Sequence, residues 1–131
     1  MRARPEGRDV VELRVPAQPA YLAVLRTATA GLAARLDFTL DEIEDLRIAV
    51  DEACAILMPD IVAGEPLDCV FTLDGDVLDV NISAPTLGDH RPEQGSFGWT
   101  VLEALAGTVE SGTVDGRAYL RLRKQRQAGP T

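Results

Sequence analysis

The sequence predicts a two-layer α+β sandwich, in which a mostly antiparallel sheet is covered on one face by about three helices. Length and composition support this prediction, because 131 residues with 46% hydrophobic side chains suit one domain that buries its own core. Apolar patterning supports it as well, since segments of period two can be told apart from segments of helical period. Their order along the chain is strand, helix, helix, strand, strand, loop, helix, strand.

The first strand and the first helix are both visible as apolar patterns. Val11, Leu13 and Val15 alternate with charged residues, which is typical of a half-buried strand. Pro19 suits the first turn of a helix, and apolar residues then recur at spacings of three and four. A helix is therefore predicted over roughly 18–36. Its core stripe consists of Leu22, Leu25, Thr29, Leu32 and Leu36.

The second helix has the clearest start in the sequence. Thr39-Leu40-Asp41-Glu42 reads as a capping box, and Phe38 is placed to pack against Ile43 as a hydrophobic staple. Pro59 ends the helix. Its predicted core face consists of Ile43, Leu46, Val50, Ala53, Cys54 and Leu57. Asp45, Ala49, Glu52 and Ile56 are predicted to lie opposite that face, with Glu52 and Ile56 one turn apart.

The second half of the chain predicts a hairpin, a long loop, a helix and a last strand. Residues 67–73 and 77–82 alternate as strands around an Asp74-Gly75 turn. From Ser83 to Phe97 no period is visible, and a loop of this length is often functional. A short third helix starts at Gly98-Trp99. After a turn at Asp115-Gly116, the last strand points inward with Ala118, Leu120 and Leu122.

Residues 9–124 form the predicted domain, with flexible ends expected at 1–8 and 125–131. No signal peptide is visible at the N-terminus, and no apolar run approaches the ~20 residues of a membrane span. We therefore expect a cytoplasmic protein without membrane contact. Cys54 and Cys69 stand in apolar patterns without a CxxC motif or a nearby histidine, so we expect neither a metal site nor thiol chemistry.

The net charge of −8 argues against direct DNA binding, because phosphate contacts require clustered Lys and Arg. Acidic residues gather in the middle of the chain. They are Asp41, Glu42, Glu44, Asp45, Asp51 and Glu52. The pattern favours a basic partner protein.

Two segments resemble motifs of a known family. Asp45-Leu46-Arg47-Ile48-Ala49-Val50-Asp51-Glu52-Ala53-Cys54 resembles the N-box helix of the GHKL (histidine-kinase-like, Bergerat) ATPases, in the version of RsbW-like anti-sigma serine kinases. Gly95-Ser96-Phe97-Gly98-Trp99, followed by Val101-Leu102-Glu103-Ala104-Leu105, resembles the family's second glycine box and the helix that it caps. The predicted element order fits the family's sandwich over nearly the entire chain.

The resemblance implies a catalytic role for Glu52 and the absence of the family's magnesium ligand. In the family, the N-box glutamate is the general base and an asparagine four residues later holds magnesium. Glu52 matches the glutamate, but Ile56 stands at the asparagine position. Magnesium requires hard oxygen ligands, and a hydrocarbon side chain offers none. Glu52 is therefore expected to be catalytic only if the chain is an active kinase, and no metal ligand is predicted.

The family's first glycine box, Asp-x-Gly-x-Gly, would fall near Ser83-Ala84-Pro85-Thr86-Leu87-Gly88. Its aspartate accepts a hydrogen bond from adenine, which Ala84 and Pro85 cannot do; Gly88 matches a glycine, and Asp89 is an alternative acceptor after a shift. Backbone amides at the start of the third helix are suited to phosphate. The resemblance thus gives Gly88, Gly95, Ser96, Phe97 and Gly98 as candidate nucleotide-binding residues. The alternative is that these glycines only cap a helix and end a loop.

We therefore predict an anti-sigma factor that sequesters an alternative sigma factor by direct binding, without a cofactor. Release would follow competition by an anti-anti-sigma protein of the STAS type. One alternative is an active kinase that uses ATP and magnesium to phosphorylate the anti-anti-sigma protein. A second is a switch controlled by another small anion or nucleotide, suggested by His90 and Arg91 in the long loop. The resemblance also implies a homodimer.

Overall fold

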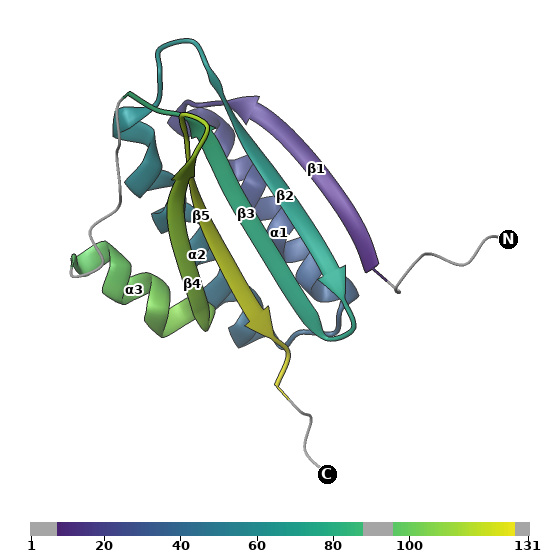
Figure 1. Ribbon diagram of the computed structural model, residues 1–131. Helices are drawn as coiled ribbons and strands as arrows, with labels where there is room; N and C mark the ends of the chain where they lie inside the picture. The colour runs from purple at the N-terminus through teal and green to yellow at the C-terminus, as the bar shows by residue number, and fades with distance from the viewer. Residues whose placement is uncertain (1–7, 88–95, 128–131) are drawn as a thin grey trace, which may run out of the picture.

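The computed structural model describes residues 8–87 and 96–127, and within them five strands form one antiparallel sheet in the order β1-β2-β3-β5-β4 (Figure 1). The elements in chain order are β1 (Arg8–Pro16), a 3-10 turn (Pro19–Tyr21), α1 (Leu22–Arg35), α2 (Leu40–Leu57), a second 3-10 turn (Met58–Asp60), β2 (Pro66–Asp74), β3 (Val77–Pro85), α3 (Phe97–Ala106), β4 (Thr108–Val114) and β5 (Arg117–Gln125).

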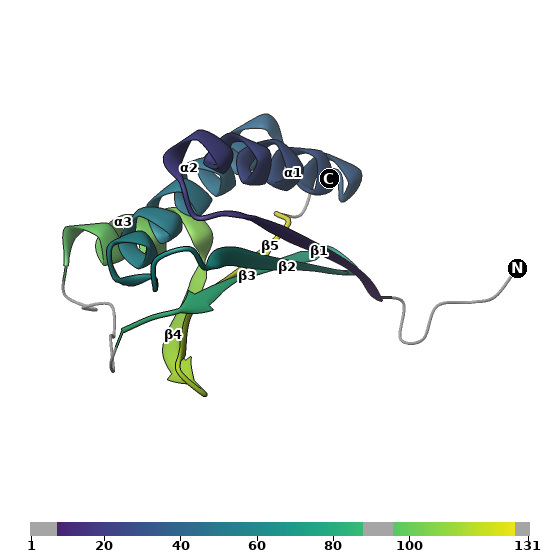
Figure 2. The same ribbon diagram turned by 90° about the horizontal axis from the view of Figure 1, so that it is seen from above.

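The described helices lie on one face of the sheet, and Figure 2 shows the two layers from above. The core lies between the layers, where inward residues of β2, β3 and β5 meet α1, α2 and α3. Its largest fully buried side chains include Phe71, Leu25, Leu46, Leu57, Leu67, Leu78, Ile82, Leu102, Leu120 and Leu122. The predicted α+β sandwich is confirmed.

The start of α2 has the predicted capping box. The backbone N–H of Thr39 donates to Oε1 of Glu42 at 2.8 Å, and the N–H of Glu42 donates to Oγ1 of Thr39 at 3.1 Å. Phe38 is buried next to this cap and Ile43 packs against the core, as expected of a staple. Two orphan amides at the helix start are thereby satisfied, which fixes where α2 begins.

The β2–β3 hairpin turns where the sequence predicts it. Asp74 pairs with Val77 across a two-residue turn, and Gly75 adopts a φ of 63°. A positive φ is accessible to glycine without steric cost. The hairpin is longer than predicted, because β3 continues to Pro85 and carries part of the expected loop into the sheet.

One strand was missing from the predicted order. β4 pairs with β5 through the turn at Asp115 and Gly116. Its inward positions are Val109, Ser111 and Thr113, of which one is apolar, so the period-two signal is too weak to see. The pattern could therefore not predict β4, the edge strand of the last hairpin.

The open face of the sheet carries a layer of ion pairs in place of a second helix layer. Asp68 on β2 accepts from Arg14 Nε at 2.7 Å and from Arg117 Nη2 at 2.6 Å. Asp79 on β3 accepts from Arg121 Nε at 2.8 Å and lies 3.8 Å from Arg123 Nη1. These pairs tie β1, β2, β3 and β5 together across the sheet.

Residues 125–127, which we placed in a flexible end, are held by hydrogen bonds. The N–H of Arg126 donates to the carbonyl of Asp76 at 2.7 Å, and the N–H of Gln127 donates to Oε2 of Glu42 at 2.8 Å. Burial acts to raise the pKa of Glu42, but hydrogen bonds from Thr39 and Gln127 outweigh it and lower that pKa. Glu42 therefore joins the start of α2 to the end of β5. Arg8, expected in the other flexible end, begins β1.

Candidate functional site

The candidate site lies where α2 meets the first turn of α3. Glu52 and Ile56 are half-buried and one turn apart on α2, facing Gly98 of α3. A methyl group built on Gly98 would lie 2.6 Å from Oε1 of Glu52 and 3.3 Å from Cδ1 of Ile56. At such short distances an added methyl group would force the side chain of Glu52 to shift, whereas glycine lets the two helices approach this closely.

We predicted that these residues lie on α2 opposite its core face, but that side of the helix is itself partly buried. Ala49 is fully buried and Ile56 packs against the core, while Glu52 is half-buried and Asp45 remains accessible. The reason is α3, which packs on this side of α2 and turns it into an interface. The periodicity of α2 alone could not reveal a second neighbour.

The start of α3 is capped by its own chain. Oγ of Ser96 accepts from the N–H of Trp99 at 3.2 Å, and the carbonyl of Ser96 accepts from the N–H of Thr100 at 3.1 Å. Phe97 is 84% exposed, whereas Trp99 is buried in the core. Ser96, Phe97 and Gly98 therefore lie at the helix start as predicted, and Gly98 lies next to the carboxylate of Glu52. The carboxylate of Glu52 therefore already supplies a negative charge at the N-terminal end of α3, where the helix dipole favours one.

Other candidate residues of the nucleotide site lie outside the described residues. They are Gly88 and Gly95, together with Asp89, His90 and Arg91 of the long loop. Their roles stay predictions.

The segment that aligns with the first glycine box is part of the sheet. Ala84 is fully buried and pairs with Ala118, and Pro85 accepts at its carbonyl from the N–H of Val62 at 3.0 Å. The N–H of Thr86 donates to Gly116 at 3.1 Å. Neither Ala84 nor Pro85 has a side-chain acceptor for an adenine amino group. The backbone here is bound on both sides, which differs from the free loop that we expected.

Thr86 is a polar residue that the sequence did not single out. Its side chain is 7% exposed, and Oγ1 has no hydrogen-bond partner among the described residues. A lone threonine after a strand gives no distinctive signal, so pattern analysis could not have found it.

The site does not fit magnesium. The position that would supply the amide ligand is the hydrocarbon side chain of Ile56, packed against the core beside Gly98. Within residues 8–87 and 96–127, no group of three His, Cys, Asp or Glu side chains is arranged to hold a metal ion. The carboxylate of Glu52 lies at this contact, and a single carboxylate does not make an octahedral site.

The two cysteines are buried away from this contact. Both Cys54 and Cys69 are free thiols. Burial raises the pKa of Cys54 to about 12 and raises that of Cys69 as well. A thiol that stays protonated at neutral pH is a poor nucleophile and a poor ligand.

The sheet order, the N-box helix and the glycine-containing start of α3 define a domain of the histidine-kinase-like ATPase class. A solved structure agrees: that of the RsbU and RsbW domains of Rv1364c from Mycobacterium tuberculosis superposes with a TM-score of 0.67. The superposition covers 90% of this chain and 32% of that one at 14% identity, so it bears on the fold alone.

Proteins of similar sequence identify the family within this class. The serine-protein kinase RsbW of Bacillus subtilis is 31% identical over 122 residues, covering 77% of this chain and 76% of the relative. The anti-sigma-F factor RsbW of Mycobacterium tuberculosis is 36% identical over 110 residues, covering 84% and 66%. No protein-family model matches the chain. The chain belongs to the RsbW family.

Proposed function

We propose that this chain is an anti-sigma factor that binds an alternative sigma factor directly and has no protein kinase activity. Competition by an anti-anti-sigma protein of the STAS type would release the sigma factor. Membership of the RsbW family supports the kind of partner, since one relative is named an anti-sigma-F factor. The proposal extends that activity to this chain.

The observation that carries the loss of kinase activity is the contact between Ile56 and Gly98 beside Glu52. Phosphoryl transfer depends on positioning and on neutralising phosphate charge, mainly with magnesium. Without a ligand at position 56 and without an adenine acceptor at Ala84 or Pro85, the family's nucleotide chemistry has no support in these residues. A protein interface draws on a broad surface and does not depend on a few such groups.

Acidic residues at the start of α2 suit a basic partner. Asp41 and Glu44 are exposed on its first turns, and we propose that the sigma factor contacts α1 and this end of α2. Charge complementarity of this kind speeds association and selects partners.

The test is recovery of sigma factors from the host cell by the purified, tagged chain. The double variant Asp41→Arg and Glu44→Arg is expected to reduce recovery by roughly tenfold or more, because it reverses the charge of the contact. Glu103→Arg, an exposed reversal on α3, is the matched control and should retain recovery. If no sigma factor is recovered under any growth condition, the proposal is wrong.

An active serine kinase is the second candidate, favoured by Glu52 at the general-base position and by the relative named serine-protein kinase. In that case Glu52 would be the base and Gly95 and Gly98 would contact the phosphates. Calorimetry with magnesium-ATP separates the two candidates. Binding heat together with phosphate transfer to an anti-anti-sigma protein would show that the chain is a kinase and contradict our proposal. Heats equal to those of buffer would exclude kinase activity.

A ligand-controlled switch is the third candidate, resting on His90 and Arg91 of the long loop. A thermal-shift screen with nucleotides and small anions tests it, and no stabilisation by any compound would remove it.

We also propose that the chain acts in the cytoplasm as a homodimer, as the resemblance implies. Among the described residues, none of the helices is long and apolar enough to cross a membrane.

A further inference from the structure

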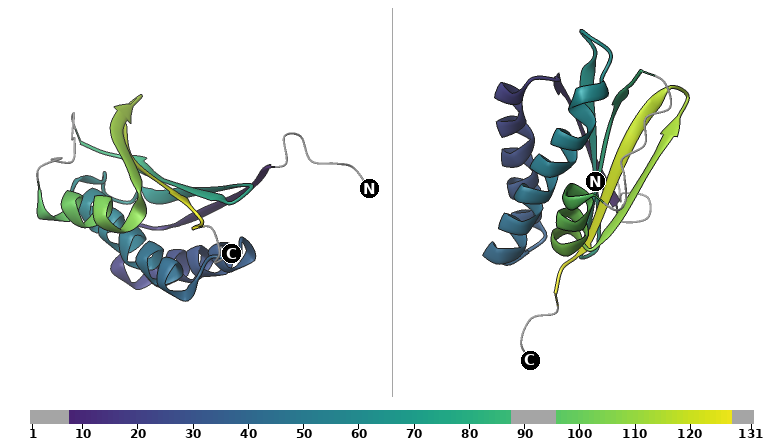
Figure 3. Two further views of the ribbon diagram at one scale, coloured as in Figure 1. Left: turned by 90° about the horizontal axis from the view of Figure 1, so that it is seen from below. Right: turned by 90° about the vertical axis from the view of Figure 1, so that its left-hand side faces the viewer.

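A pocket opens where the β1–β2 ladder ends. Pro16 and Pro66 form the last pair of this register, and proline has no N–H to donate to a ladder. Beyond this pair the two chains separate, one leading to α1 and the other coming from the turn after α2. At the top of Figure 3 (right), the purple connection after β1 and the teal connection before β2 lie next to each other. A pocket of about 490 Å³ lies between them.

The floor of this pocket is apolar. Val15 is buried, and Met58 and Ile61 pack against the core while they also line the pocket. Most of the remaining lining consists of proline, alanine, valine and glycine. Pockets that bind small molecules, of roughly 300–1,000 Å³, have such a mainly apolar lining with a few polar groups that orient the ligand.

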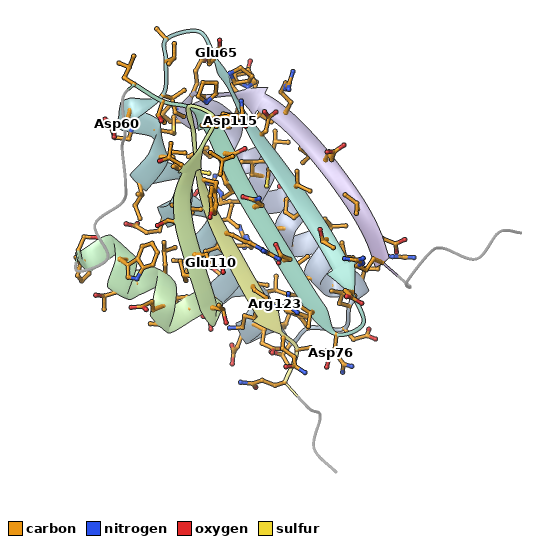
Figure 4. All side chains as sticks on the ribbon, in the orientation of Figure 1. Asp60, Glu65, Asp76, Glu110, Asp115 and Arg123 are labelled. Carbon is orange, nitrogen blue, oxygen red and sulfur yellow. The ribbon has the colours of Figure 1, made fainter. Side chains whose placement is uncertain are left out.

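Three polar side chains line the same pocket: Arg14, Gln18 and Glu65. Glu65 ends a turn that begins at Val62. Its N–H donates to the carbonyl of Val62 at 3.0 Å, and Gly64 has a φ of 83°, the positive value that a type II turn requires at this position. Figure 4 labels Glu65 at the start of β2. The turn therefore fixes an exposed carboxylate beside the pocket.

Arg14 supplies a positive charge to the pocket. Its Nε donates to Oδ1 of Asp68 at 2.7 Å, which holds the guanidinium in place while the side chain stays 71% exposed. Asp68 also accepts from Arg117 at 2.6 Å, so two guanidinium groups share one carboxylate and the three groups keep a positive charge. The hydrogen bond to Asp68 raises the pKa of Arg14, and the negative charge of Glu65 raises it further, so both acids lie near Arg14.

We propose that this pocket binds a short apolar peptide of two or three residues through both of its charged ends. The carboxylate of the peptide contacts Arg14, its ammonium group contacts Glu65, and its side chains lie on the floor formed by Met58 and Ile61. The amide of Gln18 can donate to a peptide bond and accept from it. A volume of about 490 Å³ equals that of a sphere roughly 10 Å across, and two to three extended residues span about 7–10 Å.

Calorimetry with free and capped peptides tests the contribution of each charge. Leucyl-leucine is the probe, and we expect saturable binding to the purified chain. N-acetyl-leucyl-leucine lacks the ammonium group and leucyl-leucinamide lacks the carboxylate, so each should bind roughly threefold or more weakly. Glycyl-glycine keeps both charges but has no apolar side chains to bury, and it should not bind.

Two variants assign each charge to one end of the peptide. Glu65→Gln should weaken the binding of leucyl-leucine roughly threefold and leave that of N-acetyl-leucyl-leucine unchanged, because the acetylated peptide has no ammonium group to contact position 65. Arg14→Gln should weaken leucyl-leucine by a similar factor and leave leucyl-leucinamide unchanged. Glu103→Gln, at an exposed acid of α3 away from the pocket, is the matched control and should bind all peptides like the unmodified chain.

A second pair of variants locates the site. Ala63 is exposed and lines the pocket, so Ala63→Trp should fill it and abolish binding. Ala34→Trp, at an exposed alanine near the other end of α1, is the matched control and should retain binding. In NMR spectra of the unmodified chain, leucyl-leucine should shift the amide signals of residues 14–18 and 58–66 most. Thermal unfolding checks that each variant is folded.

Four outcomes would overturn the inference. They are no binding of leucyl-leucine at about 5 mM, beyond the millimolar range of weak ligands; capped peptides that bind as tightly as the free one; binding that persists in Ala63→Trp; and free leucine that binds as tightly as leucyl-leucine, which would make the ligand an amino acid. Every measurement uses the chain alone, so failure here leaves the proposed binding of a sigma factor standing.

Discussion

The α2–α3 contact makes a prediction that a double-mutant cycle can measure. Gly98→Ala places a methyl group 2.6 Å from Oε1 of Glu52 and 3.3 Å from Cδ1 of Ile56. Overpacking costs about 1–3 kcal/mol, and the low end applies because the first atom met is the end of a flexible side chain. Alanine gains about 0.5–1 kcal/mol over glycine within a helix. The variant should therefore lose no more than about 0.5 kcal/mol of unfolding free energy.

Removing the carboxylate should reverse the sign. In a Glu52→Ala background, Gly98→Ala loses its nearest clash and keeps the helical gain, so it should stabilise by about 0.5 kcal/mol. The two residues are then coupled by about 0.5–1 kcal/mol, above the 0.3–0.5 kcal/mol or so expected for independent sites. Urea unfolding of the four proteins, followed by circular dichroism, gives the coupling directly.

The chain contains its own control for the helical gain. Gly31 is an exposed glycine of α1 with no atom within 4 Å of an added Cβ. Gly31→Ala should stabilise by about 0.5–1 kcal/mol in either background. If Gly98→Ala behaves like Gly31→Ala and the coupling with Glu52 is below about 0.5 kcal/mol, the close approach of α3 to Glu52 is refuted.

Three other predictions follow from single groups. Ile56→Asn alone should not create magnesium-dependent ATP binding in calorimetry, because Ala84 and Pro85 still lack an adenine acceptor; binding heat in that variant would contradict the account of the site. Asp79→Ala should cost about 1–2 kcal/mol in urea unfolding, since Asp79 is 6% exposed and accepts from Arg121, while Asp74→Ala at the exposed hairpin should cost far less. The pKa of Glu42 is lowered in the folded chain, so its stabilisation is present above the unfolded pKa and is lost as the pH falls through the folded pKa. Glu42→Gln should therefore make the thermal midpoint depend less on pH below about pH 4.5. A pH dependence equal to that of the unmodified chain would refute this.

Much of the fold could be predicted because its signals are local. The capping box at Thr39 depends on residues three apart, and the turn at Gly75 depends on two residues between alternating strands. Such patterns are decided within a few residues of chain. The strand β4 was missed because its inward positions hold Ser111 and Thr113, whose place in the sheet depends on pairing with β5.

The candidate site was predicted less completely because it depends on tertiary neighbours. The motifs gave Glu52, Ser96, Phe97 and Gly98, and the structure brings the first and last of these into contact. Ala49 was placed opposite the core face because the helix period cannot show that α2 has a second neighbour, and it is fully buried. The orphan hydroxyl of Thr86 depends on three segments that meet around it, at Ile61, Gly116 and β3.

Ile56 shows why the fold does not depend on the missing ligand. Its side chain packs against the core beside Leu57 and Ala53, which are fully buried. Burying an isoleucine fully contributes about 1.5–3 kcal/mol, so a half-buried one still adds about 1 kcal/mol, whereas an amide there needs a partner to offset its burial. Hydrocarbon at this position therefore stabilises the α2–α3 interface even as it removes a metal ligand. The surface of α1 and α2 on which sigma binding is proposed lies outside this contact, so selection for binding and for folding can both be met without the nucleotide chemistry.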